Sequence, residues 1–203
     1  MPECTGKRPK VKICGITNLE DAREASDLGA ELLGVVMDPA SPRHGSQATV
    51  EEIAILGKEI VGVYTSMDML RSSQLKEDTV QLHFEHSPDD IKEVKASLGK
   101  RVVSVVFLND ANDAISRINR YSSAGSDYIL VEKKGISSSL PELRTILKDF
   151  DVGISGGIGT ENIRSLAGLK PAFVDLSSSL ESLPGKKDHR KMRDFFLELE
   201  GST

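Results

Sequence analysis

Short apolar runs alternate along this chain with amphipathic stretches of helical period. The runs are rich in β-branched residues, and each is followed by polar residues or glycine. Such runs are typical of buried parallel strands, which are covered on both faces. They recur roughly every 20–28 residues, the spacing of a strand followed by a helix. We expect eight strands, over residues 11–16, 32–37, 60–65, 80–84, 102–108, 128–132, 152–155 and 173–176.

Helix start signals lie between these runs. Asn18 is a candidate N-cap for a helix over residues 19–28, and Ser87 is another candidate, with a proline directly after it. Thr49 is the cap that we expect for a helix over residues 50–56. The predicted elements therefore alternate between strand and helix along the whole chain.

This alternation implies a parallel sheet. Eight strand–helix units in a chain of 203 residues fit a compact (β/α)8 barrel, the TIM-barrel fold of the α/β class, and we expect one domain over residues 1–203. An open doubly wound sheet is the main alternative, and it usually has fewer strands.

Composition narrows the function classes. The formal net charge of −5 argues against general affinity for nucleic acid or for an anionic membrane surface. No apolar run approaches membrane-spanning length, and the first residues lack the apolar core of a signal peptide. Cys4 and Cys14 have neither zinc-site nor disulfide spacing, which indicates free thiols and a cytoplasmic protein. The sequence leaves both a monomer and a homodimer open.

In (β/α)8 barrels the active site lies at the C-terminal ends of the strands. Gly156 and Gly157 follow the seventh predicted strand, and Ser177 and Ser178 follow the eighth. Glycine pairs also occur simply in tight turns. In this fold, however, the loops after strands seven and eight commonly bind phosphate through backbone N–H groups. We therefore predict a phosphate site and a small phosphorylated substrate such as a sugar phosphate.

Cys14 lies near the end of the first predicted strand, at the same rim. Its position alone fits a catalytic thiol and a buried structural cysteine equally well.

Several segments resemble, in order along the chain, the phosphoribosylanthranilate isomerase family of tryptophan biosynthesis. They cover nearly all of the sequence, and the first and last are the most specific. The segments are residues 12–17 (KICGIT), 41–43 (SPR), 80–83 (VQLH), 155–158 (SGGI) with 161–163 (ENI), and 174–178 (VDLSS) with Glu181 and 184–188 (PGKKD).

The resemblance implies an aldose–ketose isomerase, an intramolecular oxidoreductase. Its reaction is the Amadori rearrangement of N-(5-phosphoribosyl)anthranilate to 1-(o-carboxyphenylamino)-1-deoxyribulose 5-phosphate, which needs a general acid and a general base but no metal or redox cofactor. Cys14 matches the family's base, so the site is expected to favour its thiolate. The family's acid is an aspartate at the end of strand six, where this chain has Glu132. Glu132 is accordingly the candidate acid, and a surface glutamate paired with Lys133 or Lys134 is the alternative.

The resemblance also assigns substrate contacts. Arg43 is expected to bind the anthranilate carboxylate, because a guanidinium group matches a carboxylate bidentately. Gln81 and His83 are expected to line the pocket, and Asp175 to orient the substrate amine or hold the phosphate loop. Two other functions remain open, namely an isomerase or epimerase acting on a related sugar phosphate and a barrel that binds a phosphometabolite without turning it over.

Overall fold

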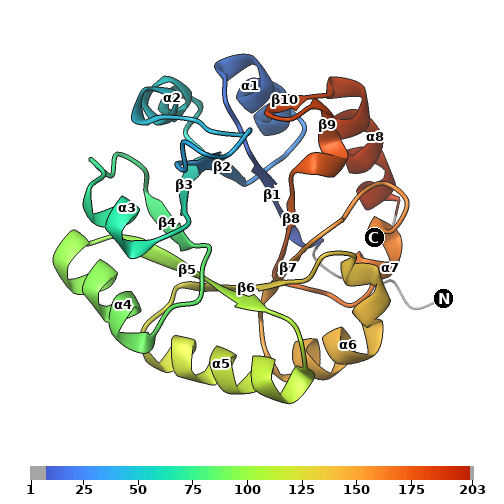
Figure 1. Cartoon of the computed structure of the whole chain (residues 1–203). Helices are drawn as coiled ribbons and strands as arrows, with labels where there is room; N and C mark the ends of the chain where they lie inside the picture. The colour runs from blue at the N-terminus through green and yellow to red at the C-terminus, as the bar shows by residue number, and fades with distance from the viewer. Residues whose placement is uncertain (1–7, 202–203) are drawn as a thin grey trace.

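Each apolar run of the sequence forms a strand that pairs in parallel with its neighbours. The computed structural model describes residues 8–201. The last strand also pairs with the first, which closes the barrel (Figure 1). The strands are β1 (Lys10–Cys14), β2 (Leu32–Val36), β3 (Glu59–Tyr64), β4 (Thr79–Leu82), β5 (Arg101–Phe107), β6 (Tyr128–Glu132), β7 (Gly153–Ser155) and β8 (Phe173–Leu176).

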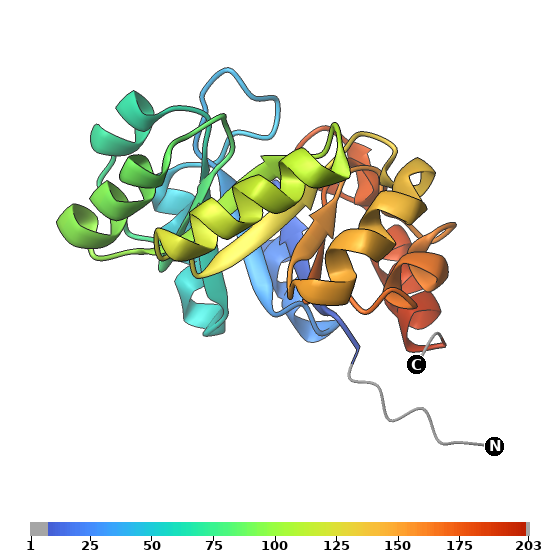
Figure 2. The ribbon, with the colours of Figure 1, turned by 90° about the horizontal axis from the view of Figure 1, so that it is seen from below.

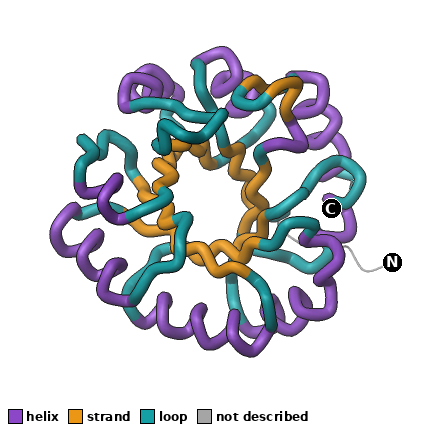
Figure 3. The backbone as a smooth tube through the Cα atoms, in the orientation of Figure 1, coloured by secondary structure: helices purple, strands orange, loops and turns teal. Residues whose placement is uncertain are grey.

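Helices form a ring around the strands, as Figure 3 shows. The predicted (β/α)8 barrel is therefore confirmed, and the open doubly wound sheet is wrong. The α-helices are α1 (Leu19–Asp27), α2 (Gln47–Ile53), α3 (Met67–Arg71), α4 (Pro88–Glu93), α5 (Ala111–Ser123), α6 (Leu140–Asp149), α7 (Ile163–Ala167) and α8 (His189–Glu200). Short 3-10 or π turns are η1 (Ala54–Leu56), η2 (Val94–Leu98), η3 (Ile136–Ser139) and η4 (Ser178–Leu180).

Side chains cap the helices largely as predicted. Asn18 accepts a hydrogen bond from the backbone N–H of Asp21 at the start of α1, and Ser87 caps α4. Thr49 is not a cap. Ser46 caps α2 instead, and Thr49 is the third helical residue of a capping box. The helix therefore begins three residues earlier than expected.

An unpredicted hairpin follows β8. It consists of β9 (Glu181–Leu183) and β10 (Lys186–Lys187), which pair antiparallel outside the barrel. The last helix, α8, begins directly after this hairpin, at His189.

The barrel interior contains an apolar layer beneath the polar side chains at the C-terminal ends of the strands. Successive side chains of a strand point alternately outward and inward. Outward residues pack beneath the helices in the large apolar core. The inward apolar layer lies toward the N-terminal ends of the strands and includes Leu32, Val61, Val103, Leu130 and Phe173. The loop between β2 and α2, light blue in Figure 2, extends beyond the C-terminal ends of the strands. Within residues 8–201, no helix combines the length and apolar character needed to cross a bilayer.

Asp21 joins α1 to the C-terminal segment. Its carboxylate accepts hydrogen bonds from the backbone N–H of Lys187 at 2.9 Å and from Asn18 at 2.9 Å, and it pairs with His189 at 2.8 Å. Burial alone would raise the pKa of Asp21, but these partners outweigh burial, so the pKa is lowered. The ionised carboxylate therefore stabilises the fold.

We expect Asp21→Asn to lower the free energy of unfolding by about 1–3 kcal/mol at neutral pH. Because the folded pKa lies below the unfolded value of about 3.9, this contribution is complete above that value and is lost as pH falls through the folded pKa. Urea unfolding at neutral pH and near pH 3 should give a difference between parent and variant that shrinks in acid. A difference independent of pH would contradict this role.

Candidate active site

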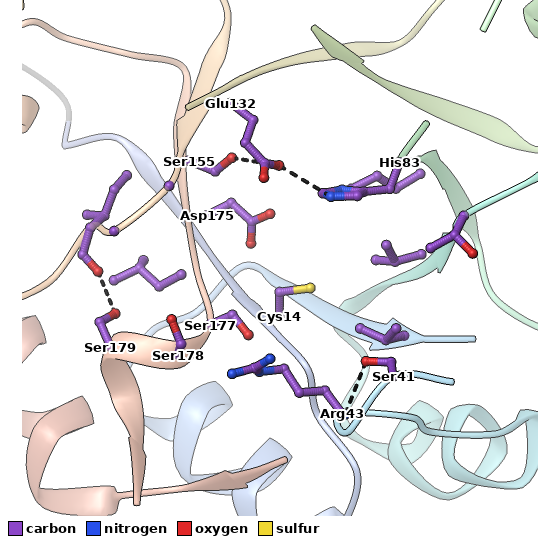
Figure 4. A pocket seen from close by; sticks show the side chains of 18 residues that line it. Cys14, Ser41, Arg43, His83, Glu132, Ser155, Asp175, Ser177, Ser178 and Ser179 are labelled. Atoms are coloured by element: carbon purple, nitrogen blue, oxygen red, sulfur yellow. Dashed lines mark hydrogen bonds and ion pairs between the residues drawn. The ribbon is translucent and has the colours of Figure 1, made fainter. Parts of the chain in front are cut away.

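A cavity of about 360 Å³ opens at the C-terminal ends of the strands (Figure 4). Its lining includes every site residue predicted from the sequence, and the barrel thus brings together side chains from the whole length of the chain. The predicted residues in the lining are Cys14, Arg43, Gln81, His83, Glu132, Gly156, Gly157, Asp175, Ser177 and Ser178.

Cys14 ends β1 and is a buried free thiol, only 9% exposed. Burial raises the pKa of this thiol, while the ammonium groups of Lys12 and Lys187 act to lower it and the Asp175 carboxylate to raise it further. The pKa lies above its usual value on balance. This differs from the expectation of a site that favours the thiolate, because the effect of burial on the pKa outweighs that of the two cations.

Glu132 ends β6 and extends into the same cavity (Figure 4). Its Oε2 atom accepts a hydrogen bond from Ser155 Oγ at 3.4 Å and lies 3.6 Å from His83 Nε2. Among the ion pairs of residues 8–201, none joins Glu132 to Lys133 or Lys134. Two strands, β7 and β8, separate β6 from β1 around the barrel, so the carboxyl group and the thiol enter the cavity from different walls.

His83 directly follows β4 and is held on both sides. Gln81 Nε2 lies 3.1 Å from His83 Nδ1, and the Phe107 ring meets the imidazole edge-on at 5.8 Å between centroids. Phe84, the next residue, packs against the apolar core outside the barrel and does not line the cavity. This bulky side chain therefore leaves the cavity mouth open.

Arg43 carries its guanidinium group into the cavity from the loop after β2. Its Nε and Nη2 atoms donate to the Glu181 carboxylate at 2.8–3.0 Å, and Nη1 takes no part in this pair. Burial would raise the pKa of Glu181, but Arg43 and Lys187 outweigh it and lower the pKa. Arg43 is therefore fixed in place, with one edge left for a ligand.

The loops after β7 and β8 form a cradle at one side of the cavity. Gly156 has φ of +111°, and a Cβ there would lie 1.9 Å from the carbonyl oxygen of Lys133. Only glycine fits this close approach. Ser177 and Ser178, which directly follow β8, belong to the cradle, and Ser177 Oγ is buried without a hydrogen-bond partner among the residues described.

Some polar residues at or next to the cavity were not assigned roles from the sequence. Lys12, Ser155, Glu181 and Lys187 all contact predicted site residues. Lys12 carried a signal, since a lysine two residues before Cys14 in an apolar strand shares its inward face.

Cys4 lies outside the described residues. Across residues 8–201, no group of three or more His, Cys, Asp or Glu side chains is arranged to hold a metal ion.

Residues 11–198 match the sequence profile described as N-(5'-phosphoribosyl)anthranilate (PRA) isomerase. The chain belongs to this family. It is 45% identical over 191 residues to the N-(5'-phosphoribosyl)anthranilate isomerase of Thermoplasma volcanium, covering 94% of this chain and 95% of that protein. The resemblance inferred from the sequence motifs is thereby confirmed.

Solved structures of PRA isomerases share the fold. Monomers generated from the dimeric Thermotoga maritima enzyme give a TM-score of 0.76 at 32% identity, covering 95% of this chain and 99% of that one. A PRA isomerase in complex with reduced 1-(o-carboxyphenylamino)-1-deoxyribulose 5-phosphate gives 0.77 at 30% identity, with the same coverage. The chain is thus a PRA isomerase family barrel over nearly its full length.

Proposed function

We propose that this protein catalyses the Amadori rearrangement of N-(5-phosphoribosyl)anthranilate in tryptophan biosynthesis, with Cys14 as general base and Glu132 as general acid. One observation carries the proposal: a thiol and a carboxyl group enter one cavity from different walls, and a glycine–serine cradle and an arginine line the same cavity. Membership of the PRA isomerase family supports the choice of substrate.

The substrate has two anionic ends, and the cavity offers a complement for each. The phosphate would lie against Gly156, Gly157, Ser177 and Ser178, where backbone N–H groups bind anions. The anthranilate carboxylate would meet the free edge of Arg43. The volume of about 360 Å³ is within the range of small-molecule sites.

The first step opens the furanose ring. Glu132 gives its proton to the ring oxygen, the bond from that oxygen to C1′ breaks, and the anthranilate nitrogen lone pair forms the C1′=N bond of a protonated Schiff base. His83 and Ser155 hold the carboxyl group in place for this transfer. A misplacement of about 1 Å can cost two orders of magnitude in rate, so these contacts matter for the longer glutamate arm.

The second step removes the C2′ proton. The Cys14 thiolate takes this proton, and the electron pair of the C–H bond forms the C1′=C2′ bond of an enolamine as the iminium charge is neutralised. The enolamine then gains a proton at C1′ and loses the proton of its C2′ hydroxyl, which yields the ketose. Asp175, with one carboxylate oxygen at the cavity, would orient the substrate amine, and Gln81 would line the floor.

Arg43→Met should raise KM for phosphoribosylanthranilate about 10- to 100-fold with a smaller effect on kcat, because a hydrogen bond to a charged group contributes about 1.5–3 kcal/mol. Arg23, which is exposed on α1, gives the matched control Arg23→Met. Steady-state kinetics should be repeated with a substrate carrying aniline in place of anthranilate. An equal loss with both substrates would refute carboxylate binding by Arg43.

The experiment that tests the proposed function compares substrates. Purified protein should convert phosphoribosylanthranilate to the ketose, measured by product chromatography. Conversion of a histidine-pathway aminoaldose in its place would favour the related isomerase, and binding of a phosphate ligand without product would favour a barrel that does not turn over its ligand.

A further inference from the structure

Lys12 is a fully buried lysine inside the barrel. It lies on β1 two residues before Cys14, so both side chains point inward. An isolated ammonium group is very unfavourable in such a place and needs a charged partner. The structure provides such a partner for Lys12.

Asp175 on β8 is that partner. Lys12 and Asp175 face each other in the β1–β8 register, and Lys12 Nζ lies 2.8 Å from Asp175 Oδ2. The other carboxylate oxygen, Oδ1, is buried without a partner among the described residues, and Asp175 lines the cavity. One oxygen therefore fixes the lysine, and the other is left as an acceptor in the site.

Gly34 on β2 has no side chain, which leaves room for the side chains of Lys12 and Cys14 to approach each other. It pairs with Cys14 in the β1–β2 register. A Cβ at Gly34 would lie 2.9 Å from Cys14 Sγ and 3.1 Å from Lys12 Nζ, so the thiol and the ammonium group converge on one point. A buried ion pair is often no more stable than well-packed apolar side chains, so stability alone does not account for this arrangement.

We propose that Lys12 is a positioning residue whose buried ammonium group stabilises the thiolate of Cys14, and that Asp175 holds it in place. The inference rests on the proposed role of Cys14 as the base. It adds a cation that counteracts the effect of burial on the thiol.

The electrostatics of the site agree with this role. Burial alone would lower the pKa of Lys12, but Asp175 and Cys14 outweigh it and raise the pKa, so Lys12 stays cationic. Lys187 is the second cation near the thiol, yet its Nζ contacts the Cys14 carbonyl oxygen at 2.6 Å and pairs with Glu181. The other charged or titratable side chains at this cavity are Asp175, Arg43, His83 and Glu132.

The test is a thiol titration that needs no turnover. In a Cys4→Ser background, which leaves Cys14 as the one cysteine of the sequence, thiolate absorbance is followed against pH. Lys12→Met should raise the midpoint by about one pH unit or more, as expected for loss of a nearby opposite charge. Lys10→Met, at an exposed position on the same strand, should leave it unchanged.

Lys12→Met leaves Asp175 without its partner, so a double variant with Asp175→Asn is measured alongside. Removal of both charges should still raise the midpoint, by a smaller amount, because Lys12 affects the pKa of the thiol more strongly than Asp175 does. An unchanged or lower midpoint in either folded variant would overturn the role of Lys12. Failure of the proposed function is a separate result, namely full turnover by Cys14→Ala.

Discussion

Cys14→Ala is expected to lower kcat for phosphoribosylanthranilate by about 10²–10⁴-fold, the usual contribution of a general base. Alanine removes the group that takes the C2′ proton and leaves a small gap in a buried position. The fold and the binding of a product analogue should therefore be nearly unchanged, as measured by circular dichroism and titration calorimetry. Cys4→Ala is the matched control and should keep full activity.

The same thiol predicts a pH dependence. Burial raises the pKa of Cys14, and the base acts only when deprotonated. In the Glu132→Gln variant, which has no acidic proton to lose, the residual activity should therefore increase as pH rises from neutral, by up to tenfold per pH unit while the thiol is mostly protonated. Full activity in Cys14→Ala, or a rate that falls over this range, would remove Cys14 from the mechanism.

Glu132→Gln should lower kcat about 10²–10⁴-fold, because the amide has the same shape but no acidic proton for the ring oxygen. Glu52→Gln, an exposed change on α2, is the control. A fall of less than about tenfold would show that Glu132 is not the general acid.

Glu132→Asp tests the length of the side chain. The carboxyl group of Glu132 lies 3.6 Å from His83 Nε2 and accepts a hydrogen bond from Ser155. Aspartate withdraws the carboxyl group from both partners. We expect intermediate activity, above that of Glu132→Gln, and equal losses in the two variants would argue for a purely structural role.

The sequence predicted the barrel because its signals are local. An apolar run reports burial on both faces of a strand, and Asn18 and Ser87 report the start of a helix within a few residues. Thr49 was misplaced because Ser46 and Thr49 carry the same capping signal and form one capping box. The β9–β10 hairpin was missed because such short strands have no periodic pattern.

The site could be located from the sequence because the C-terminal ends of barrel strands converge. The interactions within the site could not be predicted in this way. Lys12 and Asp175 are 163 residues apart, and Arg43 and Glu181 are 138 apart. Only the closed barrel brings these charges within hydrogen-bonding distance. The cations that counteract the effect of burial on the pKa of Cys14 therefore become apparent only in the structure.

The central claim is that this barrel isomerises phosphoribosylanthranilate through Cys14 and Glu132. The most direct measurement follows the loss of phosphoribosylanthranilate fluorescence with the purified protein, its Cys14→Ala variant and its Glu132→Gln variant. The account predicts a loss proportional to the concentration of the parent protein and reduced at least about a hundredfold in both variants. No loss above the uncatalysed rate with the folded parent protein, or equal loss with all three, would contradict it.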